Sequence, residues 1–312
     1  CPLHPQFVMA SHFGLMLLAG SLAFISCAHA FTAPLVVPRL AASSPMALKS
    51  GYASLVGLRP ALRVSLEQHS RRQDTLALRM KDDEWSTVKV KSNSEAADGL
   101  KSIMVDVSAD IFSSYKTPGQ YVKIRKDSSQ EKPGFFAIAS APGAGSNSLE
   151  FLIKKTDGSA WIADAAKDST VEMTVAQGNG YKYAEALGDD VSSVVLLATG
   201  SGIAPLKAVV ESGDLKSKSP KLYYGARNQA QMAFQDKFKD WEAKGVEVIP
   251  VLSQPEGSWE GKKGYIQDCL KEDLKDGSKA AALLCGVNDM VKSAKEVLKD
   301  AGVSDSNVLM NF

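Results

Sequence analysis

From residue 191 onward, apolar runs alternate with segments of helical periodicity. The apolar runs occupy 193–198, 221–225, 246–251, 281–285 and 307–311, and the helical patterns occupy 203–212, 229–243, 264–275 and 288–301. Apolar runs of this length are typical of buried strands. Strands that alternate with helices in this way predict a doubly wound parallel sheet, which binds its ligands at the carboxyl ends of the strands.

Residues 85–182 have a different pattern, in which short β-rich runs are separated by turn residues. The runs lie at 85–91, 101–107, 120–125, 135–140, 149–154 and 170–175, and a helical pattern interrupts them at 159–167. Short strands at this spacing predict a closed barrel or a sandwich.

The first 80 residues lack a globular pattern. If Met9 is the start, residues 13–30 form an apolar run that closes on Ala28-His29-Ala30, the small-residue pattern of a signal-peptide cleavage site. A membrane helix is the rival interpretation. The run is short for a span and no basic cluster follows it, which favours a signal peptide over residues 1–30 and a mature protein without a membrane anchor.

Residues 31–80 are rich in serine, alanine, leucine and arginine. Residues 1–80 contain seven basic and two acidic side chains, a net charge of +5, so the remainder of a chain whose total is +1 carries −4. An arginine-rich, acid-poor stretch is typical of a transit peptide. A signal peptide followed by such a stretch, with Phe31 first after the cut, resembles the bipartite leaders of complex plastids. We expect a second cut near Arg79 or Met80 and a location in the plastid stroma; a disordered secreted pro-segment is the alternative.

The distribution of histidine and cysteine excludes several chemistries. All four histidines lie before residue 70, so the expected mature protein has no histidine for proton transfer, Ser-His-Asp catalysis or zinc ligation. Only Cys269 and Cys285 remain there, too few for a disulfide framework or a four-thiolate iron–sulfur cluster. The mildly acidic mature part does not favour nucleic-acid binding.

The end of the first apolar run carries the strongest chemical signal. Two close glycines follow the strand and a proline opens the helix, so free N–H groups at the helix start can face an anion. This pattern predicts a phosphate-binding turn. Its residues are Thr199, Gly200, Ser201, Gly202, Ile203, Ala204 and Pro205.

With further motifs in the same order, residues 85–312 resemble the ferredoxin–NADP⁺ reductase superfamily. The motifs are Pro118-Gly119-Gln120-Tyr121 before the flavin site, Thr199 to Pro205 at the pyrophosphate, Tyr224-Gly225-Ala226-Arg227, and Cys285-Gly286 followed by Met290. A plant branch related to a kiwi-fruit ripening protein shares the runs Phe136-Ala137-Ile138-Ala139-Ser140 and Gly264-Tyr265-Ile266-Gln267. The resemblance implies a flavin-type antiparallel β-barrel over 81–182 and a doubly wound NAD(P)-binding domain over 190–312.

Members of this superfamily pass hydride between a nicotinamide dinucleotide and FAD or FMN, and then electrons to a carrier protein. The resemblance therefore implies NADP(H) or NAD(H) and FAD, with FMN as the alternative, as cofactors. It implies a ferredoxin-like or photosynthetic electron carrier as partner. Cys285 and Gly286 would place the nicotinamide against the flavin, with Cys285 either in that role or simply packed at a strand end.

The flavin side departs from the family pattern. Active members carry Arg-x-Tyr-Ser on the barrel, and the corresponding residues here are Gly134, Phe136 and Ala137. Phe136 retains an aromatic ring for stacking, and Lys123 or Lys154 is a candidate to replace the cation. Residues 137–140 and Tyr121 complete the expected flavin side. Gly158 and Ser159 match a second phosphate anchor, or else Ser159 is an N-cap in a surface turn.

Residues beyond the second strand bear on the choice of dinucleotide. No acidic residue ends that strand, where a carboxylate would bind the ribose of NAD; Arg227 stands there instead. Family members specific for NADP bind its 2′-phosphate with Ser-Arg, a basic residue and a tyrosine. Ser253, Lys263 and Tyr265 match that pattern, whereas Gln254 replaces the arginine, so NADPH is favoured. The rival to a reductase is a degenerate descendant that binds nucleotide or docks on a photosynthetic complex.

Overall fold

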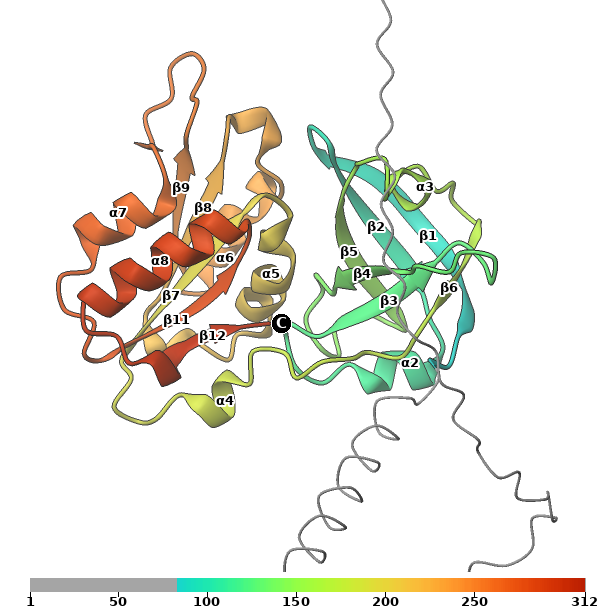
Figure 1. The fold of residues 1–312 in the computed structure, drawn as a ribbon, viewed down its shortest axis with the longest axis horizontal. Coiled ribbons are helices and arrows are strands. Elements are labelled where there is room, and N and C mark those ends of the chain that lie inside the picture. Colours follow the sequence, from blue (N-terminus) through green and yellow to red (C-terminus); the bar gives the residue numbers. More distant parts are fainter. Residues whose placement is uncertain (1–82, 312) are drawn as a thin grey trace, which may run out of the picture. The chain divides into compact units, whose positions relative to one another are not determined.

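The computed structural model describes residues 83–311, and the expected signal and transit peptides lie outside these residues. Its first sheet is antiparallel, with strand order β4-β3-β6-β1-β2-β5 (Figure 1). The strands are β1 (Ser86–Ala97), β2 (Leu100–Asp106), β3 (Tyr121–Arg125), β4 (Gly134–Ala137), β5 (Ser148–Lys154) and β6 (Thr170–Met173).

This sheet closes into a barrel, as the resemblance implied. The two end strands meet where β4 continues, through a bridge between Ile138 and Phe151 and a 2.7 Å hydrogen bond from Ala139 N–H to the Glu150 carbonyl. Alternate residues such as Val88, Val90 and Phe151 fill the interior. The pattern of short alternating strands therefore ends in a barrel rather than a sandwich.

Two short helices attach to the barrel. Helix α2 (Ala109–Ser114) was not predicted; it begins at Ser108, whose hydroxyl accepts a hydrogen bond from Ile111 N–H, and only Ile111 on it is buried. Helix α3 (Ala160–Ala163) is much shorter than the predicted 159–167, because Asn93 Nδ2 binds the carbonyls of Ala163 and Ala165 at its end.

The second sheet is parallel throughout, with strand order β10-β9-β8-β7-β11-β12. Its strands are β7 (Ser193–Thr199), β8 (Pro220–Ala226), β9 (Glu247–Leu252), β10 (Lys262–Lys263), β11 (Ala280–Cys285) and β12 (Val308–Met310). The chain order reverses between β7 and β11, so the carboxyl ends of these two central strands form the switch point of the sheet.

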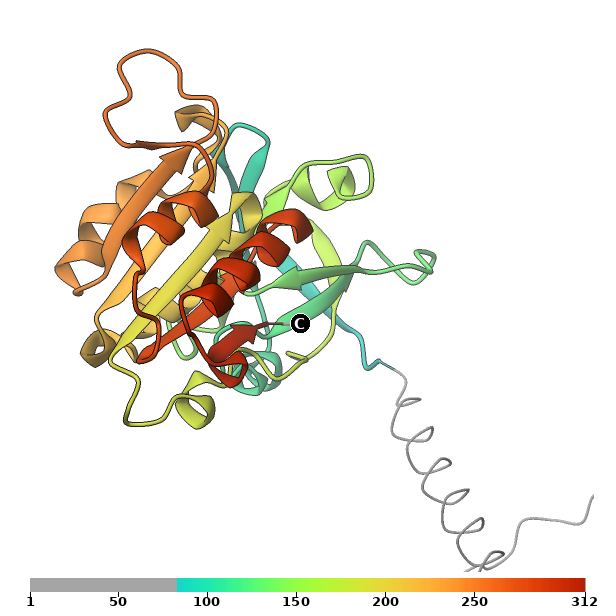
Figure 2. The same cartoon turned by 60° about the vertical axis from the view of Figure 1, so that its left-hand side comes forward.

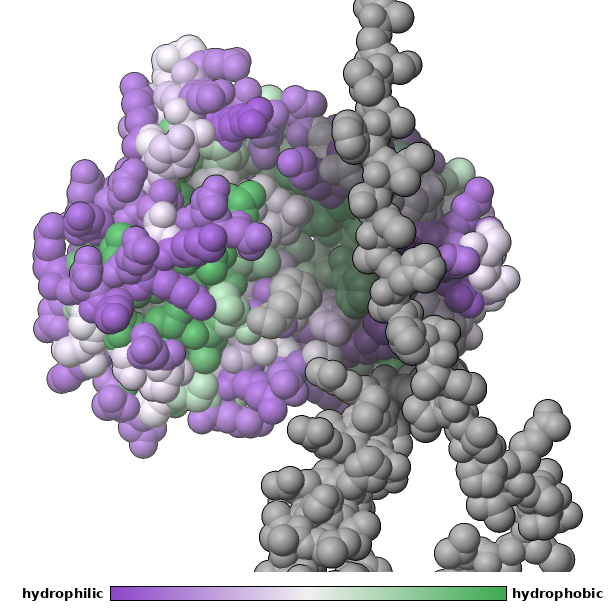
Figure 3. Space-filling model, in the orientation of Figure 1, coloured by the Kyte–Doolittle hydropathy of each residue, from purple (hydrophilic) through white to green (hydrophobic). Residues whose placement is uncertain are grey.

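Helices cover both faces of this sheet, as predicted for a doubly wound fold (Figure 2). The helices are α5 (Ile203–Ser212), α6 (Phe238–Ala243), α7 (Ile266–Asp273) and α8 (Asn288–Asp300). Successive β7 residues alternate between two cores: Leu196 packs with residues of α5 and α6, whereas Leu197 packs with residues of α7 and α8. The solvent-facing side of α7 and α8 is mainly hydrophilic (Figure 3).

The predicted helix over 229–243 is wrong in its first half. The chain there makes two 3₁₀ turns, Gln229–Gln231 and Gln235–Lys237, and Phe234 has a left-handed backbone with φ 61°. Met232, Ala233 and Phe234 are all buried, so their packing overrides the helical periodicity and leaves only α6.

Barrel and parallel sheet share one apolar core. Ala97, Leu100, Ala139 and Leu152 of the barrel side belong to the same buried cluster as α5, and Asp98 N–H donates to the Ala230 carbonyl at 2.8 Å. Between the two sheets the chain forms a single turn of helix, α4 (Tyr183–Ala186). Among residues 83–311, no helix is long and apolar enough to cross a membrane.

Candidate functional site

The glycine turn lies at the carboxyl end of β7, where the sequence predicted it. Gly200 has φ 55°, a conformation that favours glycine, and residues Gly200–Gly202 form a 3₁₀ turn that leads directly into α5. The Tyr224 hydroxyl fixes this turn, because it donates to the Gly200 carbonyl at 3.4 Å and accepts from Ala233 N–H at 3.1 Å. Open space lies beside Gly200, so a ligand can approach the backbone there.

The glycine turn interlocks with the turn after β11. A Cβ atom on Gly202 would lie 2.6 Å from the carbonyl carbon of Cys285, and one on Gly286 would lie 2.6 Å from Met290 Cε and in collision with Thr199 Oγ1. Val287 N–H donates to the same Thr199 hydroxyl at 3.1 Å. Both turns therefore reach their close approach only because neither glycine has a side chain.

Cys285 is half-buried at the end of β11 and pairs in register with Ala198. Burial raises the pKa of the Cys285 thiol to about 12, although the hydrogen bond with Tyr181 acts in the opposite direction. The buried Tyr181 hydroxyl also lies 3.4 Å from the Leu284 carbonyl. At neutral pH the thiol is protonated, so Cys285 offers a small neutral surface at the switch point rather than a nucleophile. Met290 is buried beneath the turn and has a packing role.

The predicted 2′-phosphate residues converge at the same edge of the sheet. Arg227 follows β8 and Ser253 follows the adjacent strand β9, and Ser253 N–H donates to the Ala226 carbonyl. Lys263 lies on β10, where it pairs with Leu252 of β9. Arg227, Lys263 and Tyr265 are exposed, Tyr265 to 61%. Within residues 83–311 neither Arg227 nor Lys263 has an ion-pair partner, whereas Lys262 lies 2.7 Å from Asp273.

The expected flavin side is assembled from β3 and β4. Phe136 pairs with the buried Val122 and packs against the barrel core, and its ring covers Gly134 so closely that a Cβ there would lie 2.6 Å from Phe136 Cζ. Phe135 lies on the opposite face of β4 and is 59% exposed. The centroid of its ring is 5.7 Å from that of the Tyr121 ring. Gly134, which replaces the family's arginine, therefore leaves the space beside its backbone to the ring of Phe136.

The continuation of β4 is tied to β5. Ala137 pairs with Tyr121, Ile138 and Ala139 are fully buried, and the Ser140 hydroxyl accepts from Glu150 N–H at 3.2 Å. The small side chains of this stretch keep the backbone close to its neighbours. The barrel thus provides a rigid, mostly apolar support rather than a ring of polar groups.

The two candidate cations near β4 differ in their partners. Lys123 is bound to both oxygens of Asp83, at 2.9 and 2.7 Å, and its charge is already neutralised. Lys154 is exposed, shares its side of β5 with Glu150 and Leu152, and has no ion-pair partner among residues 83–311. Of the two lysines, Lys154 is the one whose charge is not already paired within residues 83–311.

Gly158 and Ser159 form a tight turn beside Lys154. The Ser159 hydroxyl donates to the Lys154 carbonyl at 2.5 Å and accepts from Thr156 N–H at 3.0 Å, and makes no capping bond to α3. Ser159 is therefore the N-cap residue of α3 by position, since its carbonyl accepts from Ile162 N–H and Ala163 N–H, but its side chain does not cap the helix. Because this hydroxyl closes its own loop, it is not aimed at a ligand.

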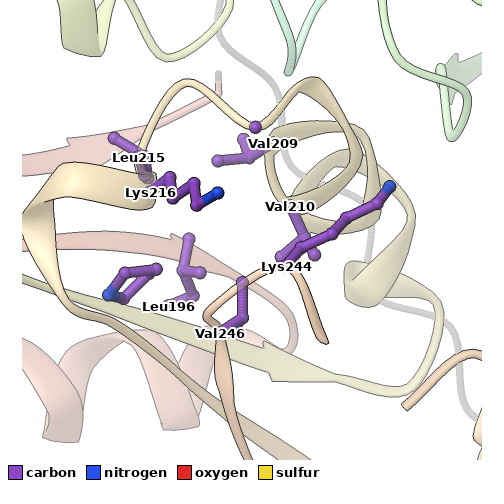
Figure 4. A pocket seen from close by; sticks show the side chains of 9 residues that line it. Leu196, Val209, Val210, Leu215, Lys216, Lys244 and Val246 are labelled. Atoms are coloured by element: carbon purple, nitrogen blue, oxygen red, sulfur yellow. The ribbon is translucent and has the colours of Figure 1, made fainter. Parts of the chain in front are cut away.

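Two other features do not belong to a ligand site. A cavity of about 10 Å³ lies at the opposite, amino-terminal edge of the parallel sheet, lined by residues that include Leu196, Val209, Pro220 and Val246, and it has room for about one water molecule (Figure 4). In the described part of the chain, no three acidic, cysteine or histidine side chains converge to hold a metal ion.

Comparisons with known proteins agree with this geometry. The family description Oxidoreductase NAD-binding domain matches residues 196–296. Fruit protein pKIWI502 from Actinidia deliciosa is 35% identical over 254 residues, 76% of this chain and 80% of that protein. The xylene/toluene monooxygenase electron transfer component XylA from Pseudomonas putida is 30% identical over 200 residues, 60% of this chain but only 54% of XylA.

Among solved structures, a ferredoxin NADP⁺ reductase from Neisseria gonorrhoeae with bound FAD and NADP has a TM-score of 0.64 at 19% identity, over 73% of this chain and 98% of that one. The barrel, the doubly wound sheet and the interlocked turns are the architecture of the NAD(P)H-dependent oxidoreductases of the ferredoxin reductase type. The chain belongs to the ferredoxin–NADP⁺ reductase superfamily, as its motifs indicated.

Proposed function

We propose that this protein takes hydride from NADPH onto a flavin and passes electrons onward to a carrier protein. The observation that carries the proposal is the interlock of the glycine turn with the Cys285–Gly286 turn at the switch point of the sheet. In this arrangement the pyrophosphate would bind at the start of α5, and the nicotinamide would bind at the neighbouring turn, beside Cys285.

The side chains of this site bind and orient rather than transfer protons. The first N–H groups of α5 and the open backbone at Gly200 would hold the pyrophosphate, and the neutral Cys285 thiol would let the nicotinamide lie close to its neighbours. A flavin, when bound, supplies the redox chemistry itself. This division of roles is consistent with a described chain that contains no histidine.

The preference for NADPH is supported by Arg227 and Lys263. Both are exposed cations at the edge where β8, β9 and β10 end, and Ser253 and the exposed ring of Tyr265 lie at the same edge. A 2′-phosphate placed there would meet positive charge, whereas an unphosphorylated ribose would gain little from it.

Lys263→Ala is expected to weaken NADPH binding by about 10-fold and NADH binding by less than 2-fold, since one charge-assisted contact to phosphate is worth about 1.5 kcal/mol. Isothermal titration calorimetry measures both affinities. Lys262→Ala is the matched control, because Lys262 is bound to Asp273, and it is expected to leave the ratio of the two affinities unchanged. Equal losses for both dinucleotides in Lys263→Ala would remove the basis for naming NADPH.

Lys154→Ala is expected to weaken binding of FMN and FAD by about 5-fold but not that of riboflavin, because only the first two carry phosphate. Lys123→Ala, the matched control, is expected to change none of the three affinities, since Asp83 already holds that lysine. Quenching of flavin fluorescence gives the dissociation constants. A larger loss in Lys123→Ala than in Lys154→Ala would reverse this assignment.

The visible spectrum of residues 81–312 separates the reductase from its rival. The rival, a degenerate nucleotide-binding or docking module, is favoured by one observation: the ring of Phe136 fills the space beside Gly134. A yellow protein that is bleached by NADPH supports the reductase. A protein that stays colourless after flavin is added supports the rival.

We propose a ferredoxin-like carrier as the electron acceptor and the plastid stroma as the location. The first is supported by the relative named as an electron transfer component, and the second by the arginine-rich, acid-poor composition of residues 31–80. Fluorescence from a fusion of residues 1–80 to a reporter should be confined to plastids in an alga with complex plastids. Secretion of the reporter would contradict the location.

A further inference from the structure

A buried charge cluster joins α5 to the barrel. Every residue from Ile203 to Val210 is buried, including Lys207, whose side chain is only 5% exposed. Its ammonium lies 2.9 Å from Glu150 Oε2 on β5 and 2.7 Å from Glu211 Oε2 one turn further along α5. It also lies 3.4 Å from the Ala139 carbonyl.

The rest of the cluster is also hydrogen-bonded. The Ser102 hydroxyl donates to the second oxygen of Glu150 at 2.8 Å, and Trp241 Nε1 donates to the second oxygen of Glu211 at 3.3 Å. Burial lowers the pKa of Lys207, but the two carboxylates more than offset this and raise it, so the lysine is charged. The cluster is a complete polar network inside an apolar interface.

The cluster connects the supports of the two expected cofactors. Lys207 is the fifth residue of α5, about 7 Å along the helix from the glycine turn. Glu150 holds the continuation of β4 with its backbone, through Ala139 N–H at 2.7 Å and the Ser140 hydroxyl at 3.2 Å, while its side chain holds Lys207. One residue of the barrel thus contacts both the flavin side and the nucleotide helix.

We propose that Lys207, through Glu150, is a positioning residue that fixes the glycine turn relative to residues 136–140 and so sets the distance over which hydride moves. This inference rests on the proposed function. A buried ion pair is a poor source of stability, because apolar side chains of the same volume stabilise as well or better. Its directional bonds instead restrict how the helix and the barrel can slide, as a purely apolar contact does not.

The kinetic test uses the full chain with Lys207→Met, which keeps the length of the side chain and removes its charge. Single-turnover reduction of bound flavin by NADPH is expected to slow by about 50-fold, because misplacement of reacting groups by about 1 Å has effects of this order. The dissociation constant of NADP⁺ is expected to change by less than 3-fold, because the glycine turn is intact. Lys207→Arg should restore much of the rate.

A second measurement does not depend on hydride transfer. Calorimetry is expected to show one cooperative unfolding transition in the wild type and two in Lys207→Met, as the barrel and the parallel sheet uncouple. In Glu150→Gln, Lys207 keeps its ion pair with Glu211, so the splitting into two transitions should be present but weaker. This second variant tests the coupling even if Lys207→Met does not fold. Lys221→Met is the matched control, because the Lys221–Glu247 pair lies entirely within the parallel sheet.

These two readouts separate the inference from the proposed function. A wild type that transfers no hydride would refute the proposed function, and the unfolding transitions would still test the coupling. A single transition in both Lys207→Met and Glu150→Gln, as in Lys221→Met, would overturn the inference. So would a Lys207→Met protein that reduces flavin at the wild-type rate.

Discussion

Gly202→Ala is expected to reduce hydride transfer by about 100-fold and to destabilise the protein by about 3 kcal/mol. The added methyl group would collide with the Cys285 carbonyl, which is backbone at the end of a central strand and has no flexible side chain to move aside. The two turns must then separate, and with them the expected pyrophosphate and nicotinamide positions. Stopped-flow reduction and chemical denaturation measure the two effects.

Gly213→Ala is the matched control for this substitution. Gly213 ends α5 with φ 77° and has nothing within 4 Å of an added Cβ, so alanine there costs only backbone strain of about 1 kcal/mol. The control should bind and react like the wild type. If Gly202→Ala also kept the wild-type rate, the interlock would not be the basis of the site.

Local periodicity was sufficient to predict most of the fold. Apart from β10, the parallel strands lie within two residues of the predicted limits. The central strands β7, β8 and β11 are mostly apolar and buried on both faces, whereas β12 has three residues, none of them buried. The strand β10 contains only Lys262 and Lys263, and no propensity marks two adjacent lysines as a strand. Its pairing with β9 is a product of the tertiary structure, as is the bent segment around Phe234.

The candidate site likewise contains residues that could be predicted from the sequence and residues that could not. The convergence of Gly200 and Cys285 was predictable, because the carboxyl ends of parallel strands share one edge. Lys263 was assigned to the site only through the family resemblance. The Lys207–Glu150 pair was not predictable, because its members are 57 residues apart, one on helix α5 and the other on strand β5 of the barrel. One signal was present: a single lysine within an otherwise apolar helical run requires a buried partner. Tyr181 and Tyr224 give no such signal, since tyrosine is intermediate in its tendency to be buried.

Alkaline solution is expected to unfold this protein cooperatively near pH 11. Burial raises the pKa of five tyrosines, which are Tyr115, Tyr181, Tyr183, Tyr223 and Tyr224. Each folded-state pKa is raised above the unfolded value of about 10, so the folded state holds these protons more tightly. The resulting stability is complete below pH 10 and is lost as the pH rises toward the folded-state values.

The size of the effect follows from the number of groups. Once the unfolded tyrosines are ionised, each contributes about 1.4 kcal/mol per pH unit, or about 7 kcal/mol per pH unit for five, against a total stability of about 5–15 kcal/mol. Lys207 and Cys285 act in the same direction, because their pKa values are raised as well. Circular dichroism and tyrosinate absorbance should therefore change together in a single steep step. Tyrosinate absorbance that rose gradually while the fold persisted would show that these hydroxyls are accessible in the native state, and would contradict the packing around Tyr181 and Tyr224 on which both turns depend.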